Sequence, residues 1–368
     1  MNIVFRVDAS IEMGIGHVMR CLTLADALSD AGVQSHFVCR EHPGNLIDQI
    51  TRRGHQVHPL PRCQTGHRAV GIETQKSQPE HAHWLGCDWL TDAQQTLNSI
   101  ASLDADWLIV DHYALDERWE KLLRPACNKI MVIDDLADRY HDCDLLLDQN
   151  YYGKLKARYE GLLPSYCIQL LGPEYTILRS EFIDARGALK GRNGIVKNLL
   201  IFFGGSDYTN ETFKALDALR LLNRPDVVAH VVVGASNPHK NQIKSMCSRL
   251  PNTKYHCQVS NMAELLLNAD LALAAGGSAT LERCFLGLPA LTVVTAENQR
   301  AVTMAVEKAG AILNMGNSHG VSAQNFAQAM VDICSHPTRL ISMGKSGLKI
   351  MGGNSYSGVA GVVSAMIN

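Results

Sequence analysis

Long hydrophobic runs, a strong charge of one sign and paired cysteines are all missing from this sequence. No apolar stretch reaches the roughly 18–20 residues that span a bilayer, and 34 Lys plus Arg against 36 Asp plus Glu give a net charge of −2. The cysteines number 11, an odd count without any C-x-x-C pair, and the first residues lack a secretory-signal pattern. We therefore expect a cytoplasmic protein with free thiols that binds neither nucleic acid nor a membrane.

A length of 368 residues suggests two domains, and short apolar runs alternate with helical patterns along both halves. This alternation predicts an α/β fold with one parallel sheet in each half. The predicted strands are 3–7, 36–39, 57–60, 107–110, 130–133 and 145–147, then 199–203, 228–233, 271–274, 291–294 and 311–313. A polar, glycine-rich stretch at 184–194 reads as a linker. We place the domains at 1–190 and 191–368 and allow for the last helix crossing back to the first domain.

The segment from Arg62 to Gly86 shows no strand pattern. It collects several possible metal ligands, namely Cys63, His67, His81, His83 and, just beyond it, Cys87. Structural zinc sites usually pair ligands at compact spacings that this run does not repeat. Because long irregular insertions in compact domains are usually functional or disordered, we favour a flap that faces a substrate.

A glycine loop joins the first predicted strand to the first helix. Gly14 and Gly16 stand at the start of that helix, where exposed N–H groups and the helix dipole favour an anion. A dinucleotide fingerprint would need a third glycine where Met19 stands and an acidic residue after the second strand, so NAD is excluded and NADP is disfavoured. His17, next to these glycines, is a candidate general base. The competing interpretation is that His17 caps the helix or packs under the loop.

The second half repeats this design at three strand ends. The first carries Gly204, Gly205, Ser206 and Asp207 before a helix from about Asn210, and it predicts a second anion cradle. After the next strand, Gly277 and Ser278 precede Glu282, a carboxylate that could accept both hydroxyls of a ribose or only complement the helix dipole. Asn298 and Gln299 follow a third strand, and their amides can donate to phosphate or sugar hydroxyls.

Several motifs together resemble a known family. They are Gly-Ile-Gly-His-Val-Met-Arg-Cys at 14–21, Val-Ile-Asp-Asp-Leu-Ala-Asp-Arg at 132–139, Asp-Gln-Asn-Tyr at 148–151, Gly-Gly-Ser at 204–206, Gly-Gly-Ser-x-x-x-Glu-Arg-Cys at 276–284 and Glu-Asn-Gln at 297–299. Their order is similar to that of the GT-B, MurG-like nucleotide-sugar enzymes. Within these, the chain closely resembles the PseG-like UDP-sugar hydrolases of pseudaminic acid biosynthesis.

The resemblance implies two half-sites in two Rossmann-like domains that face a central cleft. The sugar half would use His17 as the catalytic base, with Asp8, Gly14, Gly16, Arg20, Tyr113, Asp135 and Asn150 binding the sugar. Gly204, Gly205, Ser206, Gly277, Ser278, Glu282, Asn298 and Gln299 would bind UDP. Either Asp8 or Asp135 could orient the imidazole or stabilise positive charge on the sugar, or could be structural.

The reaction implied is hydrolysis of UDP-2,4-diacetamido-2,4,6-trideoxy-L-altrose to UDP and the free sugar, with inversion. We expect no cofactor and no metal, because helix-terminal N–H groups can stabilise the departing diphosphate. A UDP-sugar is the expected ligand, and other enzymes of the same sugar pathway are possible partners. A MurG-type inverting transferase would use the same groups on an acceptor hydroxyl, whereas a non-catalytic sensor could dispense with His17. A nonhydrolysing epimerase would share the fold.

Overall fold

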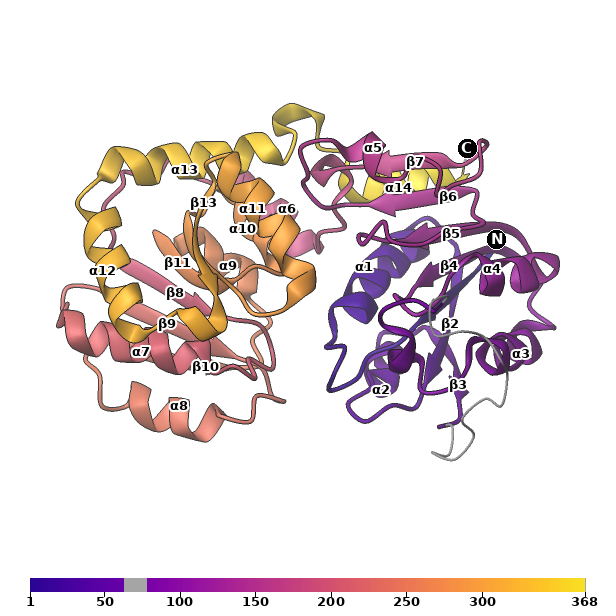
Figure 1. Ribbon diagram of the computed structural model, residues 1–368, viewed down its shortest axis with the longest axis horizontal. Helices are drawn as coiled ribbons and strands as arrows, with labels where there is room; N and C mark the ends of the chain where they lie inside the picture. Colours follow the sequence, from indigo (N-terminus) through magenta and orange to yellow (C-terminus); the bar gives the residue numbers. More distant parts are fainter. Residues whose placement is uncertain (63–77, 368) are drawn as a thin grey trace. The chain divides into compact units, whose positions relative to one another are not determined.

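The computed structural model describes residues 1–62 and 78–367 of the chain, and these fall into two compact units (Figure 1). The first unit comprises Met1–Gln149, Lys154–Ile177 and Ser357–Asn368, and the second comprises Asn150–Gly153 and Leu178–Tyr356. The division thus falls at residue 177, whereas the sequence placed it near residue 190. Cys63 and His67 of the predicted flap lie outside the described residues.

The first unit is built on a parallel sheet of seven strands in the order β3-β2-β1-β4-β5-β6-β7. The strands are β1 (Asn2–Val7), β2 (Gln34–Arg40), β3 (Gln56–Leu60), β4 (Ala105–Asp111), β5 (Cys127–Ile133), β6 (Leu145–Asp148) and β7 (Ile168–Leu171). The helices are α1 (Gly16–Asp30), α2 (Ile47–Arg52), η2 (Ala82–Leu85), α3 (Trp89–Ile100), α4 (Glu117–Leu123), η3 (Arg124–Ala126), α5 (Leu155–Arg158), η4 (Pro173–Tyr175) and α14 (Gly358–Ile367).

Both faces of this sheet are buried, as parallel sheets require. Along β1, Ile3, Phe5 and Val7 pack into one core with α1 and α14, whereas Val4 packs into the opposite core with α3 and α4. The alternation follows from the two-residue period of a strand. The last helix, α14, contacts α1, so the end of the chain belongs to the first unit's core.

The second unit repeats the plan with a six-stranded parallel sheet in the order β10-β9-β8-β11-β12-β13. Its strands are β8 (Asn198–Phe202), β9 (Val228–Val233), β10 (Thr253–Cys257), β11 (Leu271–Ala275), β12 (Ala290–Val294) and β13 (Ile312–Asn317). Its helices are α6 (Ser180–Gly187), α7 (Glu211–Leu222), α8 (Lys240–Cys247), α9 (Met262–Asn268), α10 (Ala279–Phe285), η5 (Glu297–Gln299), α11 (Arg300–Lys308), η6 (Ser318–Gly320), α12 (Ala323–Cys334), α13 (Pro337–Ile350) and η7 (Gly353–Ser355).

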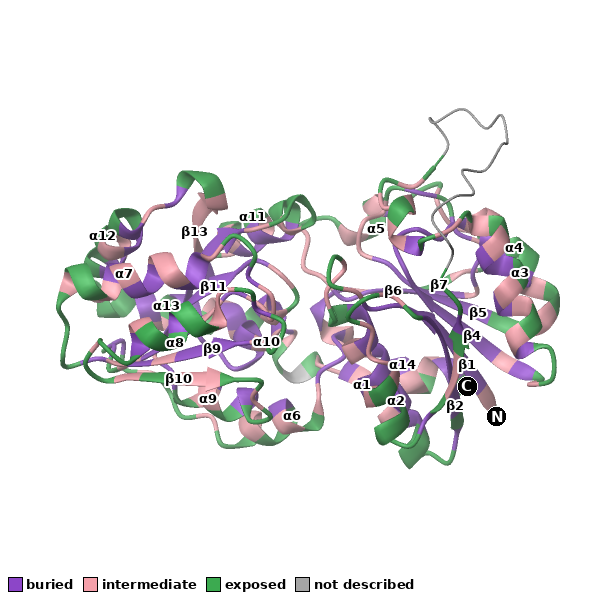
Figure 2. Ribbon diagram, turned by 90° about the horizontal axis from the view of Figure 1, so that it is seen from below, coloured by how far each residue is buried: buried purple, intermediate pink, exposed green. Residues whose placement is uncertain are grey.

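Helices cover this second sheet on both faces as well. Residues of α7, α8, α12 and α13 contribute to one core, and residues of α6, α9, α10 and α11 contribute to the other. In both units the central strands are almost entirely buried (Figure 2). The predicted α/β class with two parallel sheets is confirmed.

Two strands escaped the sequence prediction, and the predicted linker has more structure than expected. The missed strands, β7 and β10, are edge strands with mostly exposed or half-buried residues; β7 has only four residues, and β10 lacks the apolar run that marks a central strand. Residues 184–187 of the predicted linker belong to α6. Farther along, the guanidinium of Arg192 donates to the carbonyls of Leu266, Ala269 and Leu286, near the ends of α9 and α10. This stretch is therefore anchored to the second unit.

Candidate active site

The candidate site lies at the carboxyl edge of the first unit's sheet, where β1 pairs with β2 on one side and β4 on the other. Such switch points are where open α/β sheets bind ligands. The glycine loop leads from β1 into α1, and Gly14 takes a φ of +76°, which favours glycine. Gly16 is the first residue of α1, as the sequence predicted.

His17, the second residue of α1, turns its side chain to the end of β4. Its Nδ1 lies 2.5 Å from Oδ1 of Asp111, and its side chain is one-tenth exposed. Nδ1 also lies 3.3 Å from Nη2 of Arg20. Because a carboxylate only accepts hydrogen bonds, the shorter contact to Asp111 favours a proton on Nδ1, and in the neutral imidazole Nε2 is then the acceptor. The N-cap of α1 is Ile15, so His17 does not cap the helix.

Arg20, one turn along α1, binds both oxygens of the same carboxylate. Its Nε and Nη2 donate to the two oxygens of Asp111 at 2.5 and 2.6 Å. Burial by itself would raise the pKa of Asp111, but the charge of Arg20 and the contact with His17 hold it well below its usual range. Asp111 is thus an ionised, fully buried anchor for both side chains.

Tyr113 and Asp135 complete this cluster. The edge of the Tyr113 ring meets His17 with ring centroids 4.6 Å apart, and the Tyr113 hydroxyl donates to Oδ1 of Asp135 at 2.5 Å. Arg20 Nη1 reaches Oδ2 of Asp135 at 3.4 Å. Burial and the neighbouring Asp135 carboxylate raise the pKa of Tyr113, which keeps the phenol protonated as a donor. The structure therefore brings His17, Arg20, Tyr113 and Asp135 together.

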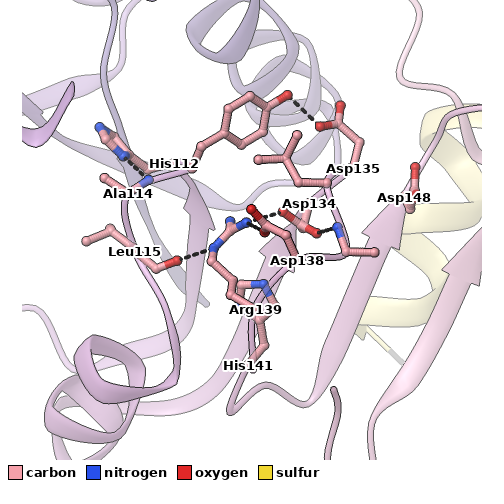
Figure 3. Close-up of polar contacts among 12 residues, drawn as sticks. His112, Ala114, Leu115, Asp134, Asp135, Asp138, Arg139, His141 and Asp148 are labelled. Atoms are coloured by element: carbon pink, nitrogen blue, oxygen red, sulfur yellow. Dashed lines mark hydrogen bonds and ion pairs between the residues drawn. The ribbon is translucent and has the colours of Figure 1, made fainter. Parts of the chain in front are cut away.

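The two aspartates after β5 have different environments (Figure 3). Asp134 is fully buried: Oδ1 lies 2.9 Å from Arg139, and Oδ2 accepts from the backbone N–H of Ala137 at 2.9 Å. Burial would raise the pKa of Asp134, but the Arg139 charge lowers it to about 2. This ion pair fixes the turn, and Asp135, 14% exposed at its side chain, is directed to Tyr113 and Arg20.

Asp8 occupies a buried polar network. Its carboxylate lies 2.8 Å from Arg6 Nη1 and accepts the backbone N–H of Arg40 at 2.6 Å, and the residue is 1% exposed. Burial acts to raise the pKa of Asp8, but Arg6 lowers it well below its ordinary value. A role for Asp8 in sugar binding stays a prediction, as does one for Asn150, which belongs to the second unit.

In the second unit, the predicted UDP motifs follow β8, β11 and β12. Gly204 has a φ of +94°, and the carbonyl of Gly205 accepts the N–H of Gly234 at 3.0 Å. A Cβ on Gly234 would come within 2.4 Å of that carbonyl, so glycine is required there for close approach. Asp207 accepts the backbone N–H groups of Glu211 and Thr212, both at 2.9 Å. Two of the amides at the start of α7 are thus already bonded to the chain's own carboxylate, and phosphate binding by the glycine loop stays a prediction.

The turn after β11 leaves its polar side chains available. Ser278 is the N-cap of α10 but makes no side-chain capping bond. Glu282, one quarter exposed, has Oε1 3.7 Å from Arg179, while burial raises its pKa against the opposing charge of that arginine. Gln299 accepts the backbone N–H of Thr295 at 3.0 Å through Oε1, which leaves its Nε2 amide as a donor. The UDP assignments of these residues stay predictions.

Asp111 is the residue that sequence reasoning missed. It is the last residue of β4, and an acidic residue that ends a buried strand two positions before Tyr113 was the available signal. Among residues 1–62 and 78–367, no group of three or more His, Cys, Asp or Glu side chains could hold a metal ion. In that same part of the chain, no helix has the length and apolar character needed to cross a membrane.

Comparisons with known proteins were made on both sequence and structure. No family model matches the chain. A protein of Methanocaldococcus jannaschii described as uncharacterized is 27% identical over 82% of this chain, which spans only 57% of that relative. The UDP-2,4-diacetamido-2,4,6-trideoxy-beta-L-altropyranose hydrolase of Campylobacter jejuni is 24% identical over 84% of this chain and 97% of its own length. The spore coat polysaccharide biosynthesis protein SpsG of Bacillus subtilis is 24% identical over 99% of this chain and 98% of its own.

Among solved structures, the spinosyn rhamnosyltransferase SpnG superposes with a TM-score of 0.67 at 16% identity, covering 100% of both chains. MurG of Acinetobacter baumannii gives a TM-score of 0.63 at 12% identity, covering 99% of both chains. These two likenesses concern the fold. The chain has the GT-B fold of these glycosyltransferases, and the resemblance to the diacetamido-trideoxy-altropyranose hydrolase is confirmed at the level of sequence similarity.

Proposed function

We propose that this chain hydrolyses a UDP-linked 2,4-diacetamido-2,4,6-trideoxy sugar to UDP and the free sugar, with inversion at the anomeric carbon. The observation that carries the proposal is the His17–Asp111 pair at the carboxyl edge of the first sheet, with Nε2 of the imidazole left to act as a base. The similarity to the Campylobacter jejuni hydrolase over most of both chains supports the choice of substrate.

In the proposed reaction, a water molecule gives a proton to Nε2 of His17 as its oxygen bonds to the anomeric carbon. The bond from that carbon to the diphosphate oxygen breaks, and UDP leaves with the electron pair. Asp111 keeps Nδ1 protonated and stabilises the imidazolium that forms. Solvent then takes the proton from His17, which restores the base. UDP is a good leaving group, so no strong general acid is required.

The remaining predicted residues have binding roles in this proposal. Arg20, Tyr113 and Asp135, which contact one another beside His17, position the sugar, with help from Gly14 and Gly16. In the second unit, backbone amides at 204–206 and 277–278 would bind the diphosphate, and Glu282 would accept from the ribose hydroxyls. Asp8, being buried, would act by holding the backbone at Arg40.

The decisive experiment is incubation of the purified protein with the UDP-linked diacetamido sugar and no acceptor. We expect release of UDP, and NMR of the first-formed sugar should show the inverted anomer. The same imidazole could instead deprotonate an acceptor hydroxyl, and the fold is shared with glycosyltransferases. UDP release only after addition of an acceptor would favour that transferase function over hydrolysis.

A further inference from the structure

An aromatic cluster extends from His17 to the short helix η2. The ring centroids of His81, Trp84 and Tyr113 form a triangle with sides of 4.4, 5.5 and 5.8 Å, and the ring planes lie within 38° of one another. The longest side is far shorter than the other two sides added together, so the three centroids do not lie in a line. No ring is therefore sandwiched between the other two. Tyr113 in turn meets His17. A continuous series of ring contacts therefore leads from Trp84 through the buried Tyr113 to the proposed base.

This part of the flap region is fixed in place by several independent contacts. Leu85 is 1% exposed in the core that includes α3 and α4, and Gly86 has a φ of +75°. A Cβ at Gly86 would come within 2.8 Å of the His42 ring, so the backbone packs closely on that side chain. His83 Nε2 lies 3.0 Å from Oε1 of Glu12, on the loop that precedes α1. The position of Trp84 relative to His17 is thus set by packing on both sides.

Trp84 offers a combination of groups that the cluster itself does not use. The residue is only half-buried, and its indole N–H makes no hydrogen bond to any residue in 1–62 or 78–367. An indole joins a large apolar face to a single polar donor. The complementary ligand carries methyl groups next to an amide carbonyl. A 6-deoxy sugar with acetamido substituents has this chemistry, whereas an ordinary hexose presents hydroxyls instead.

We propose that Trp84 is a specificity-determining residue: its ring contacts the methyl groups of an acetamido-6-deoxy sugar held beside His17, and its N–H donates to an acetamido carbonyl. The inference deepens the proposed function and rests on it for the position of the sugar. His81 supports the indole face, and Tyr113 connects it to the catalytic pair. The short helix η2 thereby gains a role in substrate selection.

The first test compares wild type, Trp84→Ala and Trp84→Phe. The readouts are KM for the UDP-linked diacetamido-trideoxy sugar and the inhibition constants of UDP and of UDP-N-acetylglucosamine, which has a hydroxyl at C6 and only one acetamido group. Trp84→Ala should raise the first KM by about 10- to 200-fold, the range for lost apolar contacts in a pocket. The inhibition constant of UDP, which carries no sugar, should stay within about twofold, and that of UDP-N-acetylglucosamine should rise less than the KM, because this sugar keeps one acetamido group but has no methyl at C6. Trp84→Phe, which keeps an aromatic face but has no N–H donor, should recover only part of the loss.

The matched control is Trp89→Ala, since Trp89 is also half-buried but stacks with Arg118 at 5.3 Å. It should leave KM near the wild-type value. Equal KM values in Trp84→Ala and wild type, or equal losses for Trp84→Ala and Trp89→Ala, would overturn the proposal.

A second measurement separates this inference from the proposed function. Should the wild-type protein release no UDP, the hydrolase proposal fails, and calorimetric titration with the free diacetamido-trideoxy sugar still tests Trp84. Binding to wild type that is weakened at least about tenfold in a folded Trp84→Ala variant supports the inference. Unchanged affinity in that variant, or no binding of the free sugar to wild type, contradicts it.

Discussion

The carboxylate of Asp111 accepts the Nδ1 proton of His17 across 2.5 Å, so the last residue of β4 sets the tautomer of the second residue of α1. The same carboxylate also accepts two hydrogen bonds from Arg20. Asp111 therefore orients the imidazole of His17, while Arg20 compensates the charge of Asp111 in buried surroundings. This arrangement resembles the carboxylate–imidazole pairing that general-base mechanisms use elsewhere.

Replacement of His17 by Asn should impair the chemical step alone. The Asn amide can still donate to Asp111, but it offers no equivalent of Nε2. Loss of a general base typically lowers the rate by about 10²–10⁴-fold, and we expect this fall in kcat. UDP affinity should remain nearly intact, because the predicted nucleotide residues belong to the second unit. Steady-state kinetics and calorimetry with UDP measure the two quantities.

Thermal stability provides the control for this assignment. Loss of a base alone should leave the melting temperature of His17→Asn close to that of wild type. A packing role would instead lower the melting temperature and leave the folded fraction nearly active. A stable variant with more than about a tenth of wild-type kcat would remove His17 from the role of base.

Glu282→Gln should weaken UDP binding about tenfold or more. A neutral amide loses charge-assisted hydrogen bonds to the ribose hydroxyls, which are worth roughly 1.5–3 kcal/mol in total. Glu181→Gln is the matched control, because Glu181 contacts the same Arg179 at 2.6 Å but belongs to α6 and not to the turn and helix that follow β11. If both variants bind UDP as wild type does, Glu282 has a structural role only.

The fold could be predicted from the sequence wherever burial leaves an apolar run. The central strands of both sheets were found because each is covered on both faces, as β11 shows with five buried residues. The edge strands β7 and β10 could not be found in this way, since β7 has only four residues and β10 is largely polar. The anchoring of Arg192 was equally invisible, because it depends on the carbonyls at helix ends distant in sequence.

Candidate site residues could be predicted from the sequence where they belong to a recognisable motif. Arg20, Tyr113 and Asp135 were selected through the resemblance, and the structure brings them into direct contact. Asp111 was missed because its partners lie more than 90 positions earlier, and only the pairing of β1 with β4 brings them together. The loss of two α7 amides to Asp207 had a different cause: Asp207 lies only four and five residues before them, but glycine spacing does not encode side-chain direction.

Turnover should not require a divalent metal. Two Asp-x-Asp pairs exist, at 104–106 and 142–144, but both lie at the amino ends of strands, at the edge opposite the candidate site. Arg124 contacts both Asp142 and Asp144. Full activity after EDTA treatment and dialysis is therefore expected, with N–H groups stabilising the diphosphate. A strict requirement for Mg²⁺ or Mn²⁺ would contradict this prediction.

The last prediction concerns His112, whose burial and hydrogen bond to Ala114 favour a neutral ring. Its Nδ1 accepts the backbone N–H of Ala114 at 3.1 Å (Figure 3), so the proton resides on Nε2, 3.3 Å from Asp8. Burial lowers the pKa of His112, although Asp8 opposes the shift. In the unfolded chain His112 has the ordinary histidine pKa of about 6.5, so it takes up a proton more readily there than in the folded chain. The contribution of His112 to the free energy of unfolding is therefore fully present above that pH and is lost as the pH falls below it.

Urea unfolding at pH 7.5 and pH 5.5 measures this effect for wild type and His112→Asn, whose amide oxygen can still accept from Ala114. A difference of one bound proton between the folded and unfolded chains changes the free energy of unfolding by at most about 1.4 kcal/mol per pH unit. The free energy of unfolding should therefore fall less between pH 7.5 and pH 5.5 in His112→Asn than in wild type. Other histidines, such as the buried His36 and the half-buried His230, have pKa values lowered by burial and contribute equally to both proteins. His319→Asn, at an exposed position, controls for the loss of an imidazole as such. An identical pH dependence in wild type and His112→Asn would mean that the fold accepts the proton at Nδ1 and that the Ala114 bond does not hold the ring neutral.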